Sequence, residues 1–402
     1  MKSFEDVKGQ RQADVYKRGV LAARLERYES GTRFSYLPEY LVVGGPAVAA
    51  SLPLSSEDVI RTSGAVPPFF AGLLPEGRRL SLLRRAVKTS MDDELSLLLA
   101  VGGDTVGDVR IVPRGSVVAE VPAAVVLDPK VPVDFDEVME QTGVDPSALA
   151  GVQDKLSAGM ISLPVEAGGK RFILKLDPPE YRHVVENEFL MYSYARRLKI
   201  PTSAVRVVRD VAGRPGLLVE RFDRDTAPQG ELRRLAVEDA TQILGLHPAA
   251  KYDVPYEQVC RELIALCDAP LPALRNLALQ LVFAWLTGNG DLHAKNVSLL
   301  QDALGGTAIA PIYDIPSTVV YGDRSLALPI AGKRTGISRK HLLGWMEDVG
   351  LPQRVADRVL GIALNANGAL IDDLRGGAAP FSDAEIRSWV KELKNRRRLV
   401  EE

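Results

Sequence analysis

One stretch decides the fold of this chain: Thr287-Gly288-Asn289-Gly290-Asp291-Leu292-His293-Ala294-Lys295-Asn296-Val297-Ser298-Leu299-Leu300. An apolar run with helical spacing, residues 277–286, precedes it and ends in a Gly-Asn-Gly turn. The turn presents an acid, Asp291, and five positions later an amide, Asn296, before a β-prone segment begins. A polar loop between a buried helix and a strand is typical of an active site, because such loops hold reactive groups on a rigid scaffold.

A second acid follows this loop at a spacing that fits phosphoryl transfer. The reaction needs a carboxylate that accepts the proton of the attacking hydroxyl and an oxygen ligand that holds Mg²⁺ on the phosphates. Asp291 and Asn296 have the Asp-x-x-x-x-Asn spacing of kinase catalytic loops, and Asp314 follows eighteen residues after Asn296. In kinases a hairpin separates the catalytic loop from a second metal-binding aspartate. We therefore expect Asp291 to be the catalytic base, and Asn296 and Asp314 to bind Mg²⁺.

These residues also have a simpler interpretation as turn and cap residues. Asn289, Asp291 and Asn296 occupy a glycine-rich connection, where Asn and Asp commonly bond to the nearby backbone. The loop by itself does not decide between the two interpretations. Asp314 and the upstream motifs described below favour catalysis.

Length and composition limit the class of protein. The 402 residues exceed what one hydrophobic core normally organises, so about two or three subdomains are expected. A hydrophobic fraction of 46% and a charged fraction of 25% are typical of a globular protein, and the net charge of −2 argues against a surface built mainly for nucleic acid. Cys260 and Cys267 indicate buried core residues and no disulfide framework. No apolar run approaches the ~18 residues of a membrane span, so a cytoplasmic protein is expected.

The hydrophobic periodicity changes along the chain and predicts an α+β protein with three domains. Residues 1–125 are expected to form a β-rich N-terminal subdomain, residues 126–237 a kinase-like N-lobe, and residues 238–402 an all-helical C-lobe. The first boundary rests on residues 113–132, which are rich in Val, Ala and Pro and poor in helix signals. A β-rich first half and a helical second half, with the catalytic-type loop inside the second, favour a bilobal protein-kinase-like fold. From residue 238 onwards, nearly everything apart from residues 291–321 is expected to be helical.

A strand lysine and a helix glutamate are expected to face each other. Lys175 ends the β-prone run Phe172-Ile173-Leu174-Lys175, and a strand lysine in kinases neutralises the α- and β-phosphates. The helix that follows carries Glu186 and Glu188, and its apolar stripe favours Glu188 as the partner. The alternatives are an exposed strand lysine and a solvated helix glutamate. The strand-then-helix order favours the catalytic interpretation of Lys175.

Two further segments are candidates for nucleotide binding. The apolar strand around residues 217–220 is followed by charged residues, as in the hinge between the lobes of a kinase. Backbone N–H and C=O groups of Glu220, Arg221 and Phe222 would then be available to an adenine edge. On physical grounds alone an ordinary strand end is the stronger interpretation. A phosphate-binding loop is expected where a kinase places its glycine-rich loop, although this motif is weak. Its residues are Ala150, Gly151, Val152, Gln153, Asp154 and Lys155.

Other polar residues have weaker signals. His293 and Lys295 lie inside the catalytic loop, where they are expected to touch phosphate or to shape the loop. Zinc is not supported, because the remaining histidines are scattered and no Cys/His cluster occurs. The basic tail, residues 391–398, has the charge for a nucleic-acid contact, but cations near the end of a terminal helix are more often surface residues favoured by the helix dipole.

Taken together, these motifs resemble those of the HipA-type serine/threonine kinases, the toxins of HipBA-like type II toxin–antitoxin modules. The resemblance runs through almost the whole chain in eight blocks that follow the family's order. They are Ser51-Leu52-Pro53-Leu54, Phe69-Phe70-Ala71-Gly72-Leu73-Leu74-Pro75, Ala150-Gly151-Val152-Gln153-Asp154-Lys155, Phe172-Ile173-Leu174-Lys175, Glu186-Asn187-Glu188, Val219-Glu220-Arg221-Phe222-Asp223-Arg224, Gly290-Asp291-Leu292-His293-Ala294-Lys295-Asn296 and Tyr313-Asp314-Ile315.

The resemblance implies the fold and the site residues. ATP would lie under residues 150–155 and against Lys175, with adenine at Glu220, Arg221 and Phe222. Asp291 would be the catalytic base. The phosphates and Mg²⁺ would be surrounded by His293, Ala294, Lys295, Asn296, Tyr313 and Asp314. The implied substrate is a protein serine, in the best-known case on an aminoacyl-tRNA synthetase, and the implied partner is a HipB-like helix-turn-helix antitoxin that carries the kinase to operator DNA.

The chain departs from the family at one position. The family often has an autophosphorylated serine three residues before the loop glycine, where this chain has Ala148, and Ser147 lies one residue earlier. Alternate residues of an extended segment face opposite sides, so self-inactivation by ejection of this loop does not follow from the resemblance. Two other functions stay open: a small-molecule phosphotransferase with the same polar set, and a catalytically idle corepressor acting with an antitoxin.

Overall fold

The chain folds into two compact units. The computed structural model describes residues 7–118, 120, 122–123, 125–128, 131–141, 160–227 and 230–402. Unit 1 comprises residues 1–123, 223–250 and 300–304, and unit 2 comprises residues 124–222, 251–299 and 305–402. Several sheets and many helices occur, so the expected mixed α+β class is confirmed. The division into three domains at residues 125 and 237 stays a prediction.

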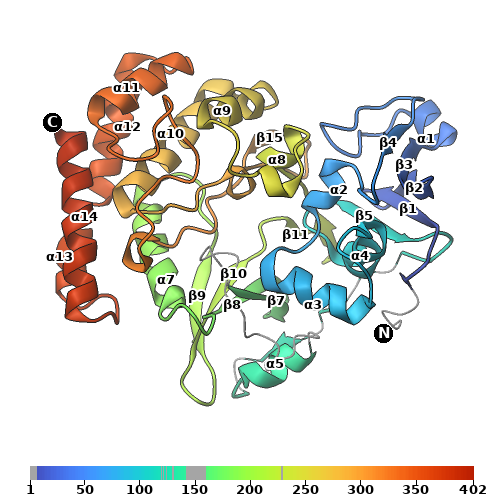
Figure 1. The fold of residues 1–402 in the computed structure, drawn as a ribbon, viewed down its shortest axis with the longest axis horizontal. Coiled ribbons are helices and arrows are strands. Elements are labelled where there is room, and N and C mark those ends of the chain that lie inside the picture. The colour runs from blue at the N-terminus through green and yellow to red at the C-terminus, as the bar shows by residue number, and fades with distance from the viewer. Residues whose placement is uncertain are drawn as a thin grey trace. The chain divides into compact units, whose positions relative to one another are not determined.

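Unit 1 is built on a five-stranded antiparallel sheet with the order β4-β3-β2-β1-β5, drawn in blue and cyan in Figure 1. Its strands are β1 (Gln12–Lys17), β2 (Val20–Tyr28), β3 (Gly31–Tyr36), β4 (Val59–Arg61) and β5 (Val109–Pro113). Alternate residues face the core, because a strand has a side-chain period of two. Val15 pairs with Ala23 on one side and with Ile111 on the other, and all three side chains are fully buried.

Short helices complete the core of unit 1. They are α1 (Pro38–Val43), α2 (Pro68–Gly72), α3 (Gly77–Val87), α4 (Glu94–Val101) and α8 (Ala240–Ile243). The apolar helix α4 is buried along most of its length, and Leu97 and Leu98 join Phe34 and Phe70 in one hydrophobic cluster. The remaining strands are β11 (Arg224–Thr226), β12 (Leu232–Arg234) and β13 (Ala236–Asp239). Unit 1 therefore has a hydrophobic core of its own.

A buried glutamate of unit 1 predicts a pH-dependent stability. Burial raises the pKa of Glu238 from 4.5 to about 7, although its carboxylate accepts the Ala50 N–H at 3.0 Å. Between these pH values the folded protein keeps a proton that the unfolded chain has lost, so the free energy of unfolding falls as the pH rises. The side chain is partly exposed, and we expect a loss of about 1–2 kcal/mol from this group.

The variant Glu238→Gln isolates this effect, because Gln is neutral at every pH and keeps an acceptor for Ala50. Urea unfolding at pH 5 and at pH 8 should show that the variant loses less stability between the two values than wild type by about 1–2 kcal/mol. Equal losses in the two proteins would contradict the assigned titration.

Unit 2 contains a second five-stranded sheet with the order β6-β7-β8-β10-β9. Its strands are β6 (Val126–Leu127), β7 (Ile161–Ala167), β8 (Lys170–Leu176), β9 (Val205–Arg209) and β10 (Pro215–Glu220). Two helices accompany it, α5 (Phe135–Gln141) and α7 (Val184–Ala195), and α7 packs on β10. Lys175 of β8 pairs with Leu217 of β10, so the lysine lies in a central strand with neighbours on both sides.

The C-terminal half of unit 2 is helical and is coloured yellow to red in Figure 1. Its helices are α9 (Tyr256–Ala265), α10 (Pro270–Thr287), α11 (Arg339–Asp348), α12 (Gln353–Ala366), α13 (Leu370–Arg375) and α14 (Asp383–Glu401), with the strands β14 (Ser298–Gln301) and β15 (Thr307–Ile309) between α10 and α11. Helix α10 is buried on nearly every side and packs against α9, α12 and α14. Such an all-round apolar helix is typical of the centre of a domain.

Three sequence expectations can be compared with this fold. Cys260 and Cys267 are free and buried, as expected. The non-helical region was predicted too short. After the 3₁₀ turn Val319–Tyr321 no helix begins until α11 at Arg339, so the irregular chain continues to Ser338. Gly322, Gly332 and Gly336 all have positive φ there, which stops a helix from continuing. Within the described residues, no helix has both the length and the apolar character that a bilayer crossing requires.

Candidate active site

Lys175 lies between two carboxylates. Its Nζ is 2.7 Å from Oε1 of Glu188 on α7 and 2.9 Å from Oδ1 of Asp314. Strand alternation explains its position, because Leu174 and Leu176 face the core and Lys175 therefore points to the other side. The expected pair of Lys175 with Glu188, in preference to Glu186, is present.

The charges of this triad are unequal, since one ammonium faces two acids. Burial would lower the pKa of Lys175, but Asp314 and Glu188 outweigh it and raise that pKa above its usual value, so the lysine stays charged. Burial raises the pKa of Glu188, whose side chain is fully enclosed. Burial also acts on Asp314, but the Lys175 ammonium dominates there and lowers its pKa. The pKa values of the two acids are therefore shifted in opposite directions, and Asp314 is the one whose ionised form the site favours.

The backbone at Asp314 is held in an uncommon conformation. Its φ is +56°, a left-handed value that is rare for a residue with a side chain. The Asp314 N–H donates to the hydroxyl of Tyr192 at 3.2 Å. Three residues further on, Asn187 of α7 bonds both to the N–H of Ser317, at 2.9 Å, and to its carbonyl, at 2.8 Å. The helix that carries Glu188 thus also fixes the segment that carries Asp314, and strain of this kind is common at functional sites.

The catalytic-type loop begins where α10 ends. Gly288, with φ +76°, terminates the helix, a position that favours glycine. The Asp291 N–H donates to Oδ1 of Asn289 at 2.7 Å, and Nδ2 of Asn296 donates to the Asp291 carbonyl at 2.8 Å. Asn289 is therefore a turn residue, as the simpler interpretation expected. Asn296 is tied directly to Asp291, which brings together the predicted base and one predicted metal ligand.

The Asp291 side chain lies in an enclosed setting that the sequence did not predict. The hydroxyl of Tyr252 donates to its Oδ1 at 3.1 Å, and Nε2 of His293 lies 3.9 Å from the same oxygen. The rings of Tyr252 and His293 meet edge to face with centroids 5.1 Å apart. Asp291 and His293 are each only 2% exposed. Tyr252 comes from the segment before α9, 39 residues upstream, and no local pattern marks it.

Tyr252 is expected to be a positioning residue. The variant Tyr252→Phe keeps the ring contact with His293 but removes the hydroxyl that orients the Asp291 carboxylate. We expect kcat to fall by about tenfold while KM for the nucleotide changes little, because the hydrogen bond acts on the residue predicted to be the base. Steady-state kinetics with a protein substrate measures both constants. A rise in KM with unchanged kcat would instead assign Tyr252 to nucleotide binding.

The catalytic-type loop and Asp314 border one another. Both His293 and Lys251 help to lower the pKa of Asp314. The Lys251 carbonyl accepts the N–H of Ala294. Tyr313 donates its hydroxyl to the Lys295 carbonyl at 2.6 Å, which connects the residue before Asp314 to the loop. The structure therefore brings His293, Ala294, Lys295, Asn296, Tyr313 and Asp314 into one cluster with Asp291 and Lys175.

The proposed hinge residues lie at the end of β10, near this cluster. The Phe222 and Tyr313 rings are 5.6 Å apart. Glu220 forms a surface ion pair with Lys170 at 2.7 Å, and the Arg221 N–H donates to the Arg171 carbonyl at 3.0 Å. Phe222 therefore has a direct side-chain contact to the predicted cluster. The predicted phosphate loop, Ala150, Gly151, Val152, Gln153, Asp154 and Lys155, lies outside the described residues, as do Ser147 and Ala148.

The oxygen atoms that Asn296 and Asp314 offer as ligands fit a magnesium ion. Mg²⁺ prefers oxygen ligands and is held in nucleotide sites by one or two carboxylates together with phosphate oxygens. The Asn296 amide nitrogen is committed to the Asp291 carbonyl, so its oxygen is the atom that remains for a cation. Asp314 is ionised and 24% of its side chain is accessible. A carboxylate and an amide oxygen are therefore available in the same cluster.

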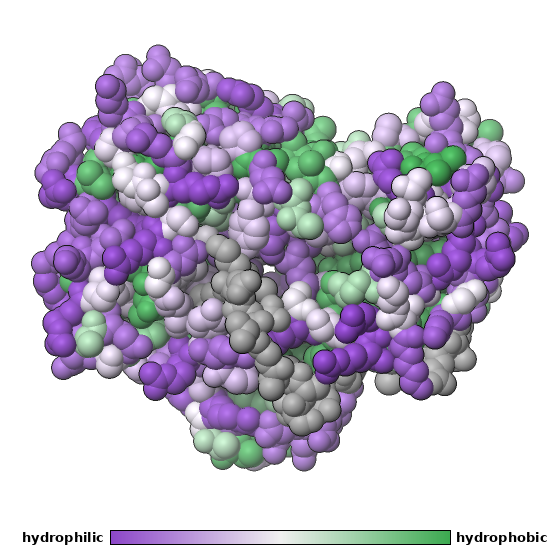
Figure 2. Space-filling model, in the orientation of Figure 1, coloured by the Kyte–Doolittle hydropathy of each residue, from purple (hydrophilic) through white to green (hydrophobic). Residues whose placement is uncertain are grey.

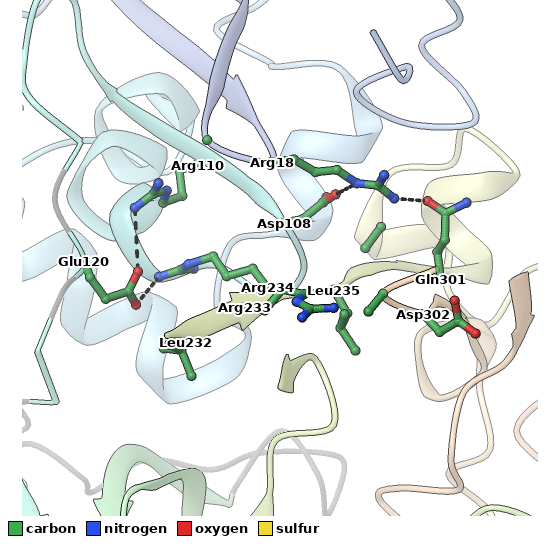
Figure 3. A pocket seen from close by; sticks show the side chains of 13 residues that line it. Arg18, Asp108, Arg110, Glu120, Leu232, Arg233, Arg234, Leu235, Gln301 and Asp302 are labelled. Carbon is green, nitrogen blue, oxygen red and sulfur yellow. Dashed lines mark hydrogen bonds and ion pairs between the residues drawn. The ribbon is translucent and has the colours of Figure 1, made fainter. Parts of the chain in front are cut away.

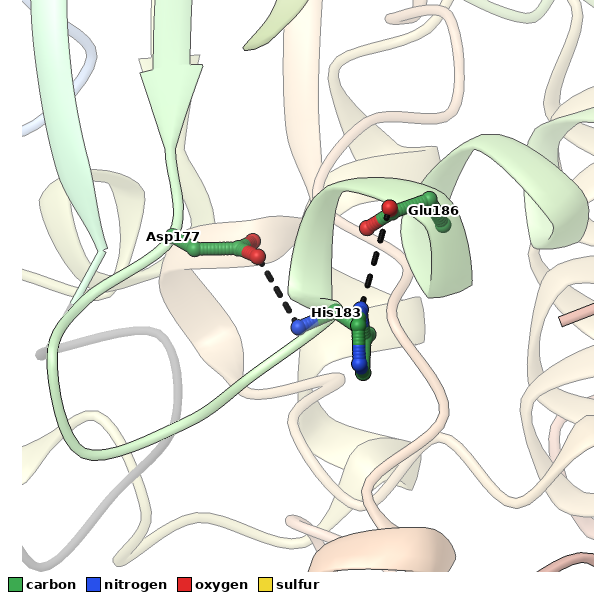
Figure 4. A group of neighbouring side chains, drawn as sticks. All are labelled: Asp177, His183 and Glu186. Atoms are coloured by element: carbon green, nitrogen blue, oxygen red, sulfur yellow. Dashed lines mark hydrogen bonds and ion pairs between the residues drawn. The ribbon is translucent and has the colours of Figure 1, made fainter. Parts of the chain in front are cut away.

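A different group of potential metal ligands lies at the start of α7. Asp177, His183 and Glu186 have ligand atoms within 4.8 Å of one another (Figure 4). Both Asp177 oxygens, however, accept backbone N–H groups, from His183 at 2.9 Å and from Val185 at 2.8 Å. These bonds satisfy donors at the helix N-terminus, where carboxylates are favoured. The group is explained by helix capping.

Unit 1 has an arginine-lined pocket of about 280 Å³ (Figure 3). Asp108 pairs with Arg18, and Glu120 lies 3.7 Å from Arg110 and 3.0 Å from Arg234. Since these acids neutralise most of the positive charge, we assign no ligand to this pocket.

Comparison with known proteins finds two family domains in this chain. The HipA N-terminal domain matches residues 13–112 and the HipA-like C-terminal domain matches residues 147–368. The putative kinase Y4mE of Sinorhizobium fredii is 30% identical over 383 residues, covering 88% of this chain and 89% of the relative. The serine/threonine-protein kinase toxin HipA of Shewanella oneidensis is 28% identical over 366 residues, covering 80% of this chain and 78% of the relative.

A solved structure supports the fold. A chain in the complex of HipA, HipB and operator DNA from Shewanella oneidensis matches with a TM-score of 0.75 at 22% identity, and the match covers 96% of this chain and 95% of that chain. The two family domains and the relatives that match most of this chain indicate one family, and the solved structure has the corresponding fold. The chain belongs to the HipA family. It is a HipA-type kinase by sequence, as the eight motif blocks predicted.

Proposed function

We propose that this protein is an ATP- and Mg²⁺-dependent serine/threonine protein kinase. The observation that carries the proposal is the joint placement of Lys175, Glu188 and Asp314 beside the loop that holds Asp291 and Asn296. Kinases require a lysine held by a helix glutamate, a metal-binding aspartate and a catalytic-loop aspartate. The roles of the individual site residues are inferred from that correspondence and from the resemblance to the HipA family.

The side chains of this cluster would divide the work of phosphoryl transfer. Lys175, held by Glu188, would neutralise charge on the nucleotide phosphates. Asp291, oriented by Tyr252, would align the substrate hydroxyl and accept its proton. Asn296 and Asp314 would hold Mg²⁺, which when bound neutralises the charge on the phosphate oxygens. Most of the acceleration would come from positioning and electrostatics, which dominate such reactions.

The nucleotide would be bound by segments on either side of this cluster. Lys175 and residues 150–155 would contact the phosphates, together with His293, Ala294 and Lys295. The adenine would lie against Glu220, Arg221 and Phe222, with Tyr313 beside Phe222. The contact between Phe222 and Tyr313 supports this arrangement, because it supplies an apolar surface for a base.

We further propose a role as the toxin of a toxin–antitoxin pair. The Shewanella oneidensis relative is named a kinase toxin, and the matching structure is a complex with HipB and operator DNA. By analogy, a HipB-like helix-turn-helix antitoxin would bind this protein, and contact with DNA would be mainly through the antitoxin. The substrate would be a serine on a translation component such as an aminoacyl-tRNA synthetase, which places the activity in the cytoplasm.

Labelling with radioactive ATP tests the proposal. The purified protein is incubated with a bacterial lysate, [γ-³²P]ATP and Mg²⁺, and a parallel sample contains excess EDTA. We expect label on one or a few proteins at serine or threonine, and its loss with EDTA, because the metal neutralises the phosphates. Label on metabolites would support a small-molecule phosphotransferase instead. No label above background would support a catalytically idle corepressor.

A further inference from the structure

A groove beside α14 is lined by cations that have no acidic partner among the residues that the structure describes. The groove has a volume of about 460 Å³ and is lined by Arg324, Arg387, Ser388, Lys391, Glu392 and Asn395. Within the described part of the chain, Arg324, Arg387 and Lys391 form no ion pair. Glu392 is already paired with Arg396 at 2.8 Å. The lining therefore presents three positive charges, and the one acid among the lining residues, Glu392, is already neutralised by Arg396.

The rest of α14 shows that this excess charge is local. Arg396, Arg397 and Arg398 each pair with an acid four residues away in the chain, at 2.8, 2.8 and 3.2 Å. Arg387 and Lys391 are also four residues apart, so their like charges repel each other on one helix face. The side of the molecule with α14 is mainly hydrophilic (Figure 2).

Neutral donors complete the lining of the groove. The Ser388 hydroxyl accepts a hydrogen bond from Nη2 of Arg324 at 3.3 Å, which holds the Arg324 side chain over α14. The Asn395 oxygen accepts from Arg398, so its amide N–H groups remain as donors. Arg387, Lys391 and Asn395 follow one another at intervals of four residues and therefore form a stripe along one face of α14. Donors of this kind suit the many acceptor oxygens of phosphoryl groups.

The groove is connected to the catalytic-type loop through the turn at residues 323–325. Arg396 is fully buried and donates to the Arg324 carbonyl at 2.6 Å and to the Trp285 carbonyl of α10 at 3.0 Å. A Cβ on Gly290, the residue before Asp291, would lie 2.6 Å from the Ser325 carbonyl oxygen. The turn that carries Arg324 therefore packs directly against Gly290.

We propose that this groove binds an anion carrying two or more phosphoryl groups, and that the bound anion holds the 323–325 turn against the catalytic-type loop. A single phosphate would occupy a small part of 460 Å³, whereas an oligophosphate can reach Arg324, Arg387 and Lys391 together. By binding the Arg324 side chain, the ligand restricts the motion of residues 323–325, which contact Gly290. The groove is then a second anion site, separate from the nucleotide site around Lys175.

The test uses tripolyphosphate as the probe, without Mg²⁺, and isothermal titration calorimetry at low ionic strength. We expect saturable binding to wild type and binding at least about tenfold weaker to Arg387→Gln/Lys391→Gln, because two charge-assisted contacts are lost. Arg354→Gln/Arg358→Gln on α12 is the matched control: this pair is also exposed, spaced by four residues and without a described acidic partner. Its affinity should change less than about twofold.

Other outcomes overturn the proposal. Equal affinities of the two double variants would assign the binding to net charge or to another site. A single-stranded oligonucleotide that binds through Arg387 and Lys391 where tripolyphosphate does not would assign the groove to a nucleic-acid backbone. Hydrogen exchange supplies the second readout: the probe should slow exchange at residues 288–291 and 318–325 in wild type, and unchanged exchange despite binding would remove the link to the loop. None of these readouts requires kinase activity.

Discussion

Asp291→Asn should lower kcat by about a thousandfold and leave the fold intact. The variant keeps the size of the side chain and an oxygen that can accept from Tyr252, but it cannot take a proton from the substrate hydroxyl. General-base catalysis commonly contributes 10² to 10⁴ in rate, so a loss of about three orders of magnitude is expected. The measurement is a single-turnover phosphorylation assay, with KM for ATP determined in parallel.

A thermal unfolding profile is the control for this variant. The Asp291 backbone bonds, to Asn289 and Asn296, do not involve the substituted carboxylate. We therefore expect a melting temperature within a few degrees of wild type and a KM for ATP of similar size. If Asp291→Asn labels its substrate as fast as wild type, Asp291 is not the base, and the proposed chemistry fails.

Lys175→Met should abolish phosphoryl transfer and also destabilise the protein. Without the ammonium, Glu188 is a fully enclosed acid with no cation, and Asp314 loses the charge that keeps it ionised. Removing one partner of a buried ion pair typically costs about 3–5 kcal/mol, because the remaining charge is left uncompensated. Urea unfolding measures the loss in stability, and the labelling assay measures the loss of activity.

A double variant separates the two effects. In Lys175→Met/Glu188→Gln the enclosed acid is replaced by a neutral amide of the same shape, so much of the lost stability should return. Activity should stay absent, because no cation faces the phosphates. Recovery of activity together with stability would show that Lys175 serves the fold alone.

The parts of this site that were predictable are those defined over short distances in the sequence. The catalytic-type loop could be identified because Gly288, Asp291 and Asn296 follow one another with a fixed spacing. The pair of Lys175 and Glu188 could be chosen because a strand and a helix have known periods, which place Glu188 and not Glu186 against the strand. The mixed α+β class followed from the same periodicities.

The remaining parts depend on contacts between distant segments. Tyr252 reaches Asp291 from 39 residues upstream, and Asn187 reaches Ser317 across 130 residues. Tyr252 does not stand out in its own neighbourhood, since a tyrosine before a helix is common. Asn187 was named only as part of the block Glu186-Asn187-Glu188, and nothing in that block predicts its contact with Ser317. The irregular chain after Tyr321 was also missed, because its path is set by Arg334, which donates to the carbonyls of Ala327 and Tyr252.

The buried guanidinium of α14 has a consequence for how the protein is made. Arg396 supports both the end of α10 and the turn beside Gly290, yet it follows Trp285 by 111 residues. A nascent chain on the ribosome can therefore form α10 and its loop long before this support is translated. The catalytic-type loop would gain this support only after α14 has emerged, so the proposed activity would wait until the helical half has been synthesised.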